Sequence, residues 1–253
     1  MKDFTTYIIN LEGEVRRKRY MEVLLSEQFI SKYSFIAAVQ GKSLSQTKLK
    51  DLYDEALAYK RYGRKLNRGE IGCTLSHYKC YEKIVKDDDY ALILEDDISV
   101  VGDIEIISKL EPILREDSPV ILFLSGDYWF YKKRKLSNNC EIASVYDAVG
   151  SYAYFINKAA AKLILMRNSR ASNVADDWAL YRRQGVKLLA VYPYLIDANI
   201  ESFESTINQS YFGENRKNMP WKFRLKAYWN AFIKKILLRQ GRFVSKIREQ
   251  RTI

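Results

Sequence analysis

Three consecutive carboxylates, Glu95-Asp96-Asp97, directly follow the apolar run 90–94. Ligands of open α/β sheets bind beyond the carboxyl ends of the strands, so acids at this position can serve a site. One or two carboxylates, together with phosphate oxygens, are the usual ligands of Mg²⁺ in such sites. A solvated acidic turn is an equally good explanation of the spacing alone, because short acidic runs are common.

A second acidic pair, Asp176-Asp177, precedes Trp178-Ala179-Leu180. Its local explanation is helix capping, since Asp at the N-cap and in the first turn stabilises a helix by about 0.5–2 kcal/mol. Capping still leaves room for a second role, because a capping carboxylate is held rigidly and can project into a cleft.

The third feature is the stretch 67–77, which contains Gly69, Gly72, Cys73 and His77. Glycine inside a helix costs about 1 kcal/mol relative to alanine, so close approach of a backbone or ligand would explain it. His77 is the one histidine of the chain, which excludes a multi-histidine metal site and favours Mg²⁺ or Mn²⁺ on carboxylates. We expect Cys73 and Cys80 to pack as small hydrophobic groups.

Strands and helices that alternate along the chain must position these residues. Apolar runs predict strands at 6–11, 33–39, 90–94, 120–124, 142–146, 151–156 and 186–196. Helical spacing predicts helices at 14–28, 45–59, 67–86, 104–115, 158–167 and 176–183, with Asn67 as an N-cap. This alternation predicts an α/β fold around a mainly parallel sheet.

The charge of the chain is concentrated at one end. The 253 residues carry a formal charge of +11, and residues 214–253 hold twelve basic and two acidic residues, a net +10. A hydrophobic content of 47% excludes global disorder. No apolar stretch approaches the roughly 20 residues that a membrane span needs, and no signal peptide is evident, so we expect a cytoplasmic protein. Three cysteines without a C-x-x-C pair predict neither a disulfide framework nor a structural zinc site.

Several motifs occur in an order that resembles glycosyltransferase family 25, which includes bacterial lipooligosaccharide galactosyltransferases and relatives that glycosylate collagen. The resemblance covers most of residues 5–207. Its motifs are Ile8-Ile9-Asn10-Leu11 with Arg16-Arg17, Ala37-Ala38-Val39-Gln40-Gly41, Gly69 through His77, Leu94-Glu95-Asp96-Asp97, Gly150-Ser151-Tyr152-Ala153-Tyr154, and Asp176-Asp177.

This resemblance implies a GT-A-type, Rossmann-like nucleotide-diphospho-sugar transferase fold and an inverting transfer. The implied function moves galactose from UDP-galactose in β linkage onto a lipooligosaccharide or LPS saccharide. UDP-glucose is the alternative donor, and a catalytically inactive saccharide- or membrane-binding member is a further alternative. A glycoside hydrolase, which also uses two carboxylates, is the rival class of enzyme and would need no nucleotide.

The resemblance also assigns roles to residues. Asp97, with Glu95, is expected to bind Mn²⁺ or Mg²⁺, whereas Glu95 or Asp96 would contact the ribose or a metal-bound water. The expected catalytic base is Asp176 or Asp177, with Glu70 as a weaker candidate. The expected donor-binding residues are Asn10, Leu11, Arg16, Arg17, Ala38, Gln40, Ser76, His77, Glu95 and Asp96. One departure from the family pattern is Asn173-Val174-Ala175, where some relatives have a proline before the late acid.

The basic end has its own pattern. Between Pro220 and Gln240, large apolar residues recur every three or four positions with Lys and Arg interleaved. We expect residues 1–213 to form the catalytic domain and 214–253 a basic amphipathic segment. Such a helix is typical of an anionic bilayer surface, which would place the protein on the inner face of the cytoplasmic membrane. The alternative is a helix packed on the catalytic domain. A nucleic-acid partner is not expected, because the rest of the chain has no recognised binding module.

Overall fold

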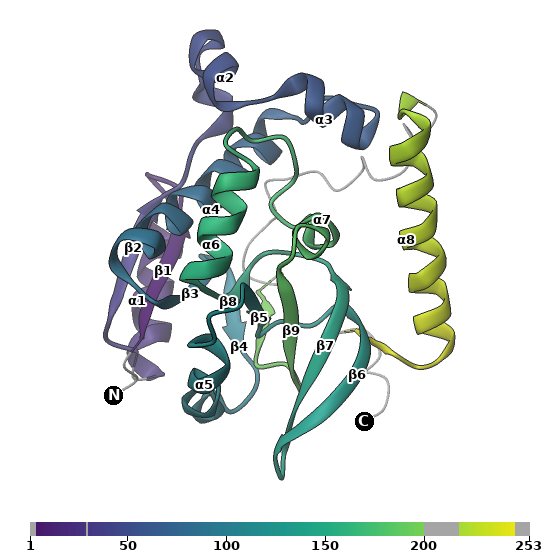
Figure 1. Ribbon diagram of the computed structural model, residues 1–253. Coiled ribbons are helices and arrows are strands. Elements are labelled where there is room, and N and C mark those ends of the chain that lie inside the picture. Colours follow the sequence, from purple (N-terminus) through teal and green to yellow (C-terminus); the bar gives the residue numbers. More distant parts are fainter. Residues whose placement is uncertain (1–3, 29, 200–217, 246–253) are drawn as a thin grey trace.

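A computed structural model describes residues 4–28, 30–199 and 218–245. Its centre is a nine-stranded sheet in the order β11-β6-β7-β9-β5-β8-β3-β1-β2 (Figure 1). The strands of this sheet are β1 (Thr5–Asn10), β2 (Tyr33–Ala37), β3 (Tyr90–Glu95), β5 (Val120–Phe123), β6 (Tyr128–Ser137), β7 (Cys140–Ala148), β8 (Ala153–Asn157), β9 (Lys187–Tyr192) and β11 (Phe243–Val244). A small second sheet pairs β4 (Ile98–Val100) with β10 (Ile196–Ala198) in antiparallel fashion.

One direction is shared by the strands β1, β2, β3, β5 and β9. β1 is parallel to both β2 and β3, and β5 is parallel to β9. β8 lies antiparallel between β3 and β5, so those two strands share the direction of β1. The predicted α/β fold is therefore confirmed, with an antiparallel strand at its centre and an antiparallel extension through β7, β6 and β11.

Helices cover both faces of the sheet. The helices are α1 (Val15–Glu27), α2 (Gln46–Leu52), α3 (Glu55–Tyr62), α4 (Arg68–Asp87), α5 (Glu111–Leu114), α6 (Lys158–Arg167), α7 (Trp178–Arg183) and α8 (Trp221–Arg239), with 3-10 turns η1 (Gly41–Ser43) and η2 (Ile104–Lys109). Successive residues of β3 alternate between two cores, with Ile93 facing α4, α6 and α7 and Leu94 facing α1 and α5. Burial on both faces explains why this strand reads as an uninterrupted apolar run.

Two predicted helices are broken. The helix expected at 45–59 ends at Leu52, because Tyr53 pairs with Ala171 and Asp54 caps a new helix by accepting a hydrogen bond from Leu57 N at 3.0 Å. The helix expected at 104–115 is η2 followed by the short α5, which has Pro112 in its first turn. Proline lacks a backbone donor and fits only the start of a helix, so it separates the two segments.

The sequence prediction missed the β6–β7 hairpin in large part. Only 142–146 was expected, whereas the paired strands extend from Tyr128 to Ala148. Strand β6 carries a run of four basic residues, 132–135, which masks the apolar alternation of a strand. Charged side chains suit this position near the end of the sheet, because they discourage pairing with other chains.

The predicted basic helix is present as α8, and one of its faces packs on the body. Leu237 is buried, and the carboxylate of Asp147 on β7 receives Lys234 Nζ at 2.5 Å and Asn230 Nδ2 at 2.9 Å. Strand β11, which follows α8, extends the main sheet by pairing with β6. This face of α8 therefore packs on the body, as the alternative for the basic helix predicted. The expected domain boundary at 213–214 lies outside the described residues.

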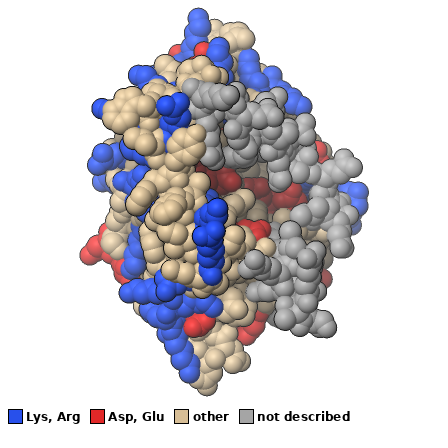
Figure 2. All heavy atoms as spheres, turned by 90° about the vertical axis from the view of Figure 1, so that its right-hand side faces the viewer, with Lys and Arg blue, Asp and Glu red and all other residues tan. Residues whose placement is uncertain are grey.

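The opposite face of α8 remains open. Its exposed large apolar side chains are Trp221, Leu225, Tyr228, Trp229 and Phe232. Figure 2 looks onto the side of the molecule that carries α8 and shows Lys and Arg distributed over this face, with Asp and Glu at the floor of an adjacent hollow. Within the described ranges, no helix is both long enough and apolar enough to cross a membrane.

Candidate active site

The acidic cluster lies at the point where the chain changes direction across the sheet. From β1 the chain moves outward to β2 and then returns to β3 on the other side of β1. The loops after β1 and β3 therefore diverge, which is the usual position of a ligand site in an open α/β sheet. Asn10 ends β1 and Glu95 ends β3, so both face this crevice.

Hydrogen bonds connect the two loops across the switch point. Asn10 Nδ2 donates to Asp96 Oδ2 at 2.7 Å. Arg17, in the first turn of α1, places its NH1 at 2.9 Å from Asp96 Oδ1 and at 3.0 Å from Asp97 Oδ2. The predicted donor-site residues Asn10 and Arg17 thus meet the carboxylates, and Asp96 is the buried acid that ties them together.

Asp97 and Glu95 have opposite pKa shifts. Burial raises the pKa of Asp97 to about 6, and the charge of Glu95 adds to this, although Arg17 lowers it. Burial also raises the pKa of Glu95, but the nearby His77 and the hydrogen bond from Ser151 outweigh burial and keep this pKa below its ordinary value. At neutral pH the cluster therefore retains negative charge that a cation could balance.

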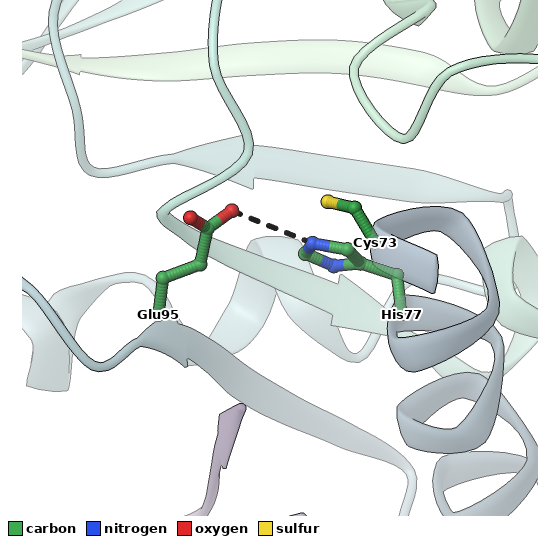
Figure 3. A group of neighbouring side chains, drawn as sticks. All are labelled: Cys73, His77 and Glu95. Carbon is green, nitrogen blue, oxygen red and sulfur yellow. Dashed lines mark ion pairs between the residues drawn. The ribbon is translucent and has the colours of Figure 1, made fainter. Parts of the chain in front are cut away.

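His77 and Ser151 hold Glu95 in place. Ser151 Oγ donates to Glu95 Oε1 at 2.8 Å, and His77 Nε2 lies 3.5 Å from the same oxygen. Figure 3 shows His77 on α4 pointing toward Glu95 at the end of β3, with Cys73 one helical turn away on the same face. Cys73 is half-buried beside the site, in contrast to Cys80, which packs in the core as expected.

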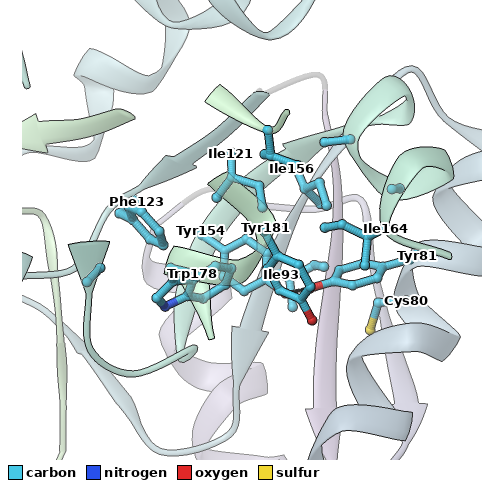
Figure 4. Packing of buried hydrophobic residues seen from close by; sticks show 14 of the residues in the cluster. Cys80, Tyr81, Ile93, Ile121, Phe123, Tyr154, Ile156, Ile164, Trp178 and Tyr181 are labelled. Carbon is cyan, nitrogen blue, oxygen red and sulfur yellow. Dashed lines mark hydrogen bonds between the residues drawn. The ribbon is translucent and has the colours of Figure 1, made fainter. Parts of the chain in front are cut away.

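A buried aromatic cluster supports His77 from behind. His77 Nδ1 and Tyr154 OH are 2.7 Å apart, and Tyr154 OH is 2.8 Å from Tyr81 OH. Figure 4 shows Tyr154 packed with Tyr81, Trp178 and Tyr181 in the core formed by α4, α6 and α7. The imidazole orientation is therefore fixed by a buried polar network, whose disruption is costly in a low-dielectric interior.

The two adjacent aspartates have different surroundings. Asp177 caps α7 by accepting from Leu180 N at 3.0 Å, and its other oxygen accepts from Tyr62 OH at 2.5 Å. Asp176 Oδ2 accepts from Gly150 N at 3.0 Å. Burial, and then the charges of Asp177 and Glu95, raise the pKa of Asp176 despite the Gly150 contact. The charge of Glu95 therefore acts on Asp176.

The carboxylate of Glu70 is held by hydrogen bonds at the start of α4. This carboxylate receives both guanidinium nitrogens of Arg64 at 2.6 and 2.8 Å and the backbone N of Asn67 at 2.8 Å. Asn67 Oδ1 in turn accepts from Glu70 N, which completes the capping box of α4. The predicted N-cap is confirmed, and the carboxylate proposed as a weaker base candidate is engaged by three donors.

The glycine-rich stretch explains how α4 approaches the loop after β2. A Cβ on Gly72 would lie 2.4 Å from Val39 O and 2.8 Å from Gly41 N, so only glycine allows this contact. Ser76 Oγ accepts from Val39 N at 2.8 Å and donates to Gly72 O at 2.7 Å. The expected donor-site residue Ser76 is therefore a buried brace for that loop.

The other expected donor-site residues are half-buried or exposed. Ala38 N donates to Asn10 O at 2.9 Å, which keeps the loop after β2 beside β1. Leu11 is half-buried after β1, while Arg16 and Gln40 are exposed. Gln40 Oε1 accepts from Ser43 Oγ at 2.7 Å.

Sequence reasoning gave no role to three groups that shape the site. Ser151 binds Glu95, and Gly150 is held between Asp176 and Trp178 Nε1, which donates to Gly150 O at 2.9 Å. Asn199 N donates to Asp97 O at 2.6 Å from a segment far along the chain. The motif Gly150-Ser151 was visible in the sequence, but the partnership with Glu95 depends on β8 lying beside β3.

The fold and this crevice define an α/β protein whose candidate ligand site lies at the switch point of the sheet, with carboxylates as the principal polar groups. A sequence model of the family described as "Glycosyltransferase family 25 (LPS biosynthesis protein)" matches residues 4–179. The chain belongs to glycosyltransferase family 25, as its motifs predicted, and its sheet and helices form the α/β fold that was expected.

Curated relatives match a shorter part of the chain. A glycosyltransferase 25 family member of Aedes aegypti is 40% identical over 96 residues, which cover 36% of this chain and 16% of the relative. Procollagen galactosyltransferase 2 of Homo sapiens is 38% identical over 96 residues, which cover 36% and 15%. The chain thus spans about a sixth of the length of these relatives.

Solved structures are similar at a lower level. A structure of galactosyltransferase LgtC with donor and acceptor sugar analogs has a TM-score of 0.36 and 12% identity, covering 73% of each chain. A 4-diphosphocytidyl-2C-methyl-D-erythritol synthase of Anaerococcus prevotii has a TM-score of 0.41 and 13% identity, covering 79% of this chain and 92% of that one.

Proposed function

We propose that this protein transfers a sugar from a nucleotide diphosphate sugar to a saccharide acceptor, with inversion at the anomeric carbon of the transferred sugar. The observation that carries the proposal is the cluster Glu95-Asp96-Asp97 at the switch point of a family 25 fold. UDP-galactose is the proposed donor and a β-linked lipooligosaccharide or LPS saccharide the proposed product. UDP-glucose is the second candidate donor, because it differs from UDP-galactose in the configuration of one hydroxyl.

A hard divalent cation, Mn²⁺ or Mg²⁺, fits the cluster. The donor atoms are carboxylate oxygens, and burial, followed by the charge of Glu95, raises the pKa of Asp97 although Arg17 lies beside it. Asp97 and Glu95 are the residues that would hold the ion. When bound, the ion supplies Lewis-acid stabilisation of the charge that develops on the departing nucleotide diphosphate.

The residues around the cluster would bind and orient the donor. Asn10, at the end of β1, holds Asp96 in position. Arg17 provides a guanidinium beside the acids, and this guanidinium can pair with phosphate oxygens. Ser151 and His77 keep the carboxylate of Glu95 oriented toward the crevice. The loop at Ala38 lies beside Asn10 and would contribute to the nucleoside pocket.

Asp176 is the proposed base that accepts the proton of the acceptor hydroxyl. A base works best when its pKa lies nearer to the working pH, and burial moves the pKa of Asp176 in that direction. Asp177 is engaged by the cap of α7 and by Tyr62, and Glu70 by Arg64, so neither offers a comparably available oxygen.

The open face of α8 supports a membrane-bound acceptor. Exposed Trp221, Leu225, Trp229 and Phe232 follow helical spacing, with basic residues between them. An amphipathic basic helix with aromatic residues can lie in the headgroup region of an anionic bilayer. We propose a peripheral location on the inner face of the cytoplasmic membrane, where a lipid-linked acceptor would be within reach of the crevice.

A screen of nucleotide sugars tests the transfer. The wild-type protein should release UDP and form a glycosylated product from a truncated oligosaccharide acceptor, with Mn²⁺ present. Asp176→Asn should abolish product formation, whereas Asp117→Ala, which changes an exposed acid after α5, should leave it unchanged. UDP binding without turnover on any acceptor would favour an inactive member of the family. Cleavage of glycosides without a nucleotide would favour a hydrolase.

A further inference from the structure

Three possible metal ligands of different chemistry converge beside the acidic cluster. They are Cys73 Sγ, His77 Nε2 and a carboxylate oxygen of Glu95, and these atoms all lie within 4.8 Å of one another. Cys73 and His77 are four residues apart on α4, so both side chains project from one face of the helix (Figure 3). Glu95 approaches from the end of β3.

The buried Nε2 atom of His77 is a second, independent observation that points to a ligand. Its side chain is 2% exposed, and among the described residues its Nε2 has no hydrogen-bond partner. This nitrogen faces Glu95 Oε1 at 3.5 Å, while Nδ1 is held by Tyr154 OH at 2.7 Å. Buried polar atoms are almost always satisfied, so an unpaired Nε2 directed at a thiol and a carboxylate suggests a ligand between them.

The surroundings of this group also suit a bound metal. Histidine ligands of metals usually bond their second ring nitrogen to a fixed polar group, and Tyr154 fills that place. Ser151 likewise braces the carboxylate of Glu95.

We propose that Cys73, His77 and Glu95 form a site for a borderline-soft divalent cation of the Zn²⁺ class. Nitrogen and sulfur donors favour such an ion over Mg²⁺ or Mn²⁺, and three protein ligands leave a fourth position open toward the crevice. On binding, the S–H bond of Cys73 breaks, a sulfur–metal bond forms, and the proton leaves to solvent.

Occupation of this site should inhibit sugar transfer. Glu95 would be shared between the Zn²⁺-class ion and the proposed donor site, so the bound ion would draw this carboxylate away from the nucleotide diphosphate. The inhibition rests on the proposed function, whereas the binding of the ion does not. A direct measurement of binding therefore separates the two.

Cobalt provides that measurement, because a Co²⁺–thiolate bond gives a charge-transfer absorption that oxygen and nitrogen ligands do not give. The full-length protein titrated with Co²⁺ should develop this band, and Zn²⁺ should displace it. Cys73→Ser should remove the band and weaken Zn²⁺ binding by roughly tenfold or more. Cys140→Ser, which changes a buried thiol at the start of β7, should retain both. Circular dichroism would verify that each variant is folded.

The outcomes distinguish the two parts of the inference. Absence of the band in the folded wild-type protein, or its persistence in Cys73→Ser, would overturn the site. If the band behaves as expected, Zn²⁺ should inhibit transfer by the wild type at saturating Mn²⁺ and should inhibit Cys73→Ser much less. Equal inhibition of both proteins would overturn the competition at Glu95. A wild type that binds Co²⁺ through Cys73 but shows no transfer would contradict the proposed function and leave the metal site supported.

Discussion

Membrane binding by the open face of α8 can be tested at two tryptophans. Trp221 and Trp229 are 62% and 64% exposed, so nearly two thirds of each side chain is available to enter a lipid surface. Complete burial of a large apolar side chain contributes about 1.5–3 kcal/mol, so each tryptophan should contribute at least about 1 kcal/mol. The double variant Trp221→Gln/Trp229→Gln should therefore bind vesicles about 30-fold more weakly, since about 2 kcal/mol corresponds to that factor.

Flotation with vesicles of phosphatidylglycerol and phosphatidylethanolamine would measure this loss. The matched control is Val15→Gln/Met166→Gln, because these apolar side chains are 71% and 66% exposed on α1 and α6, away from α8. The control should bind vesicles like the wild type. Both double variants should keep the wild-type melting temperature, since none of the four side chains is part of the core.

The ionic strength is a second variable in the same assay. The basic residues of α8 should add about 1 kcal/mol each near an anionic surface, and this contribution should fall as ionic strength rises. Unchanged binding of the tryptophan variant, or an equal loss in the control, would refute the assignment of this face to the membrane. Binding that is insensitive to lipid charge would refute the electrostatic part.

Three further substitutions probe the site and its support. Asp176→Asn should raise the melting temperature by about 2–4 °C at neutral pH while lowering kcat by about 10²–10⁴-fold. Because the pKa of Asp176 is raised, its ionised form opposes folding at neutral pH, and calorimetry should show this gain fading as the pH falls through that pKa. Gly72→Ala should destabilise the fold by about 1–3 kcal/mol in urea titrations, because a Cβ would meet Val39 O at 2.4 Å; an unchanged midpoint would contradict this contact. Glu70→Gln should destabilise the fold by about 3 kcal/mol, because it removes the charge of the carboxylate that accepts both nitrogens of Arg64. The kcat per folded molecule should persist, and its collapse would instead identify Glu70 as the base.

Much of the fold was accessible from the sequence because its strands are buried on both faces. The apolar run of β3 and the helix at 158–167 follow directly from residue pattern, and Asn67 and Glu70 form the capping box that marks the start of α4. The β6–β7 hairpin and β11 were less accessible, since their pairing depends on partners distant in sequence and their charged residues obscure the strand period.

The residues of the candidate site also differ in how far the sequence alone identifies them. The acids at 95–97 were identifiable because three adjacent carboxylates at the end of an apolar run are locally unusual. Local sequence did not distinguish Asp176 from Asp177, since their separation depends on contacts with Gly150 and Tyr62 from other elements. Nor did spacing reveal that Cys73 and His77 face Glu95, because that meeting requires α4 to lie across the end of β3.

We propose that the cluster at the switch point holds a nucleotide diphosphate through a divalent cation. Calorimetric titration of UDP into the protein, with and without Mn²⁺, tests it most directly. We predict that UDP binds tightly only with Mn²⁺, that Asp97→Ala loses this dependence together with most of the affinity, and that Asp117→Ala retains both. Equal binding of UDP with and without Mn²⁺, or unchanged Mn²⁺-dependent binding by folded Asp97→Ala, would contradict the account.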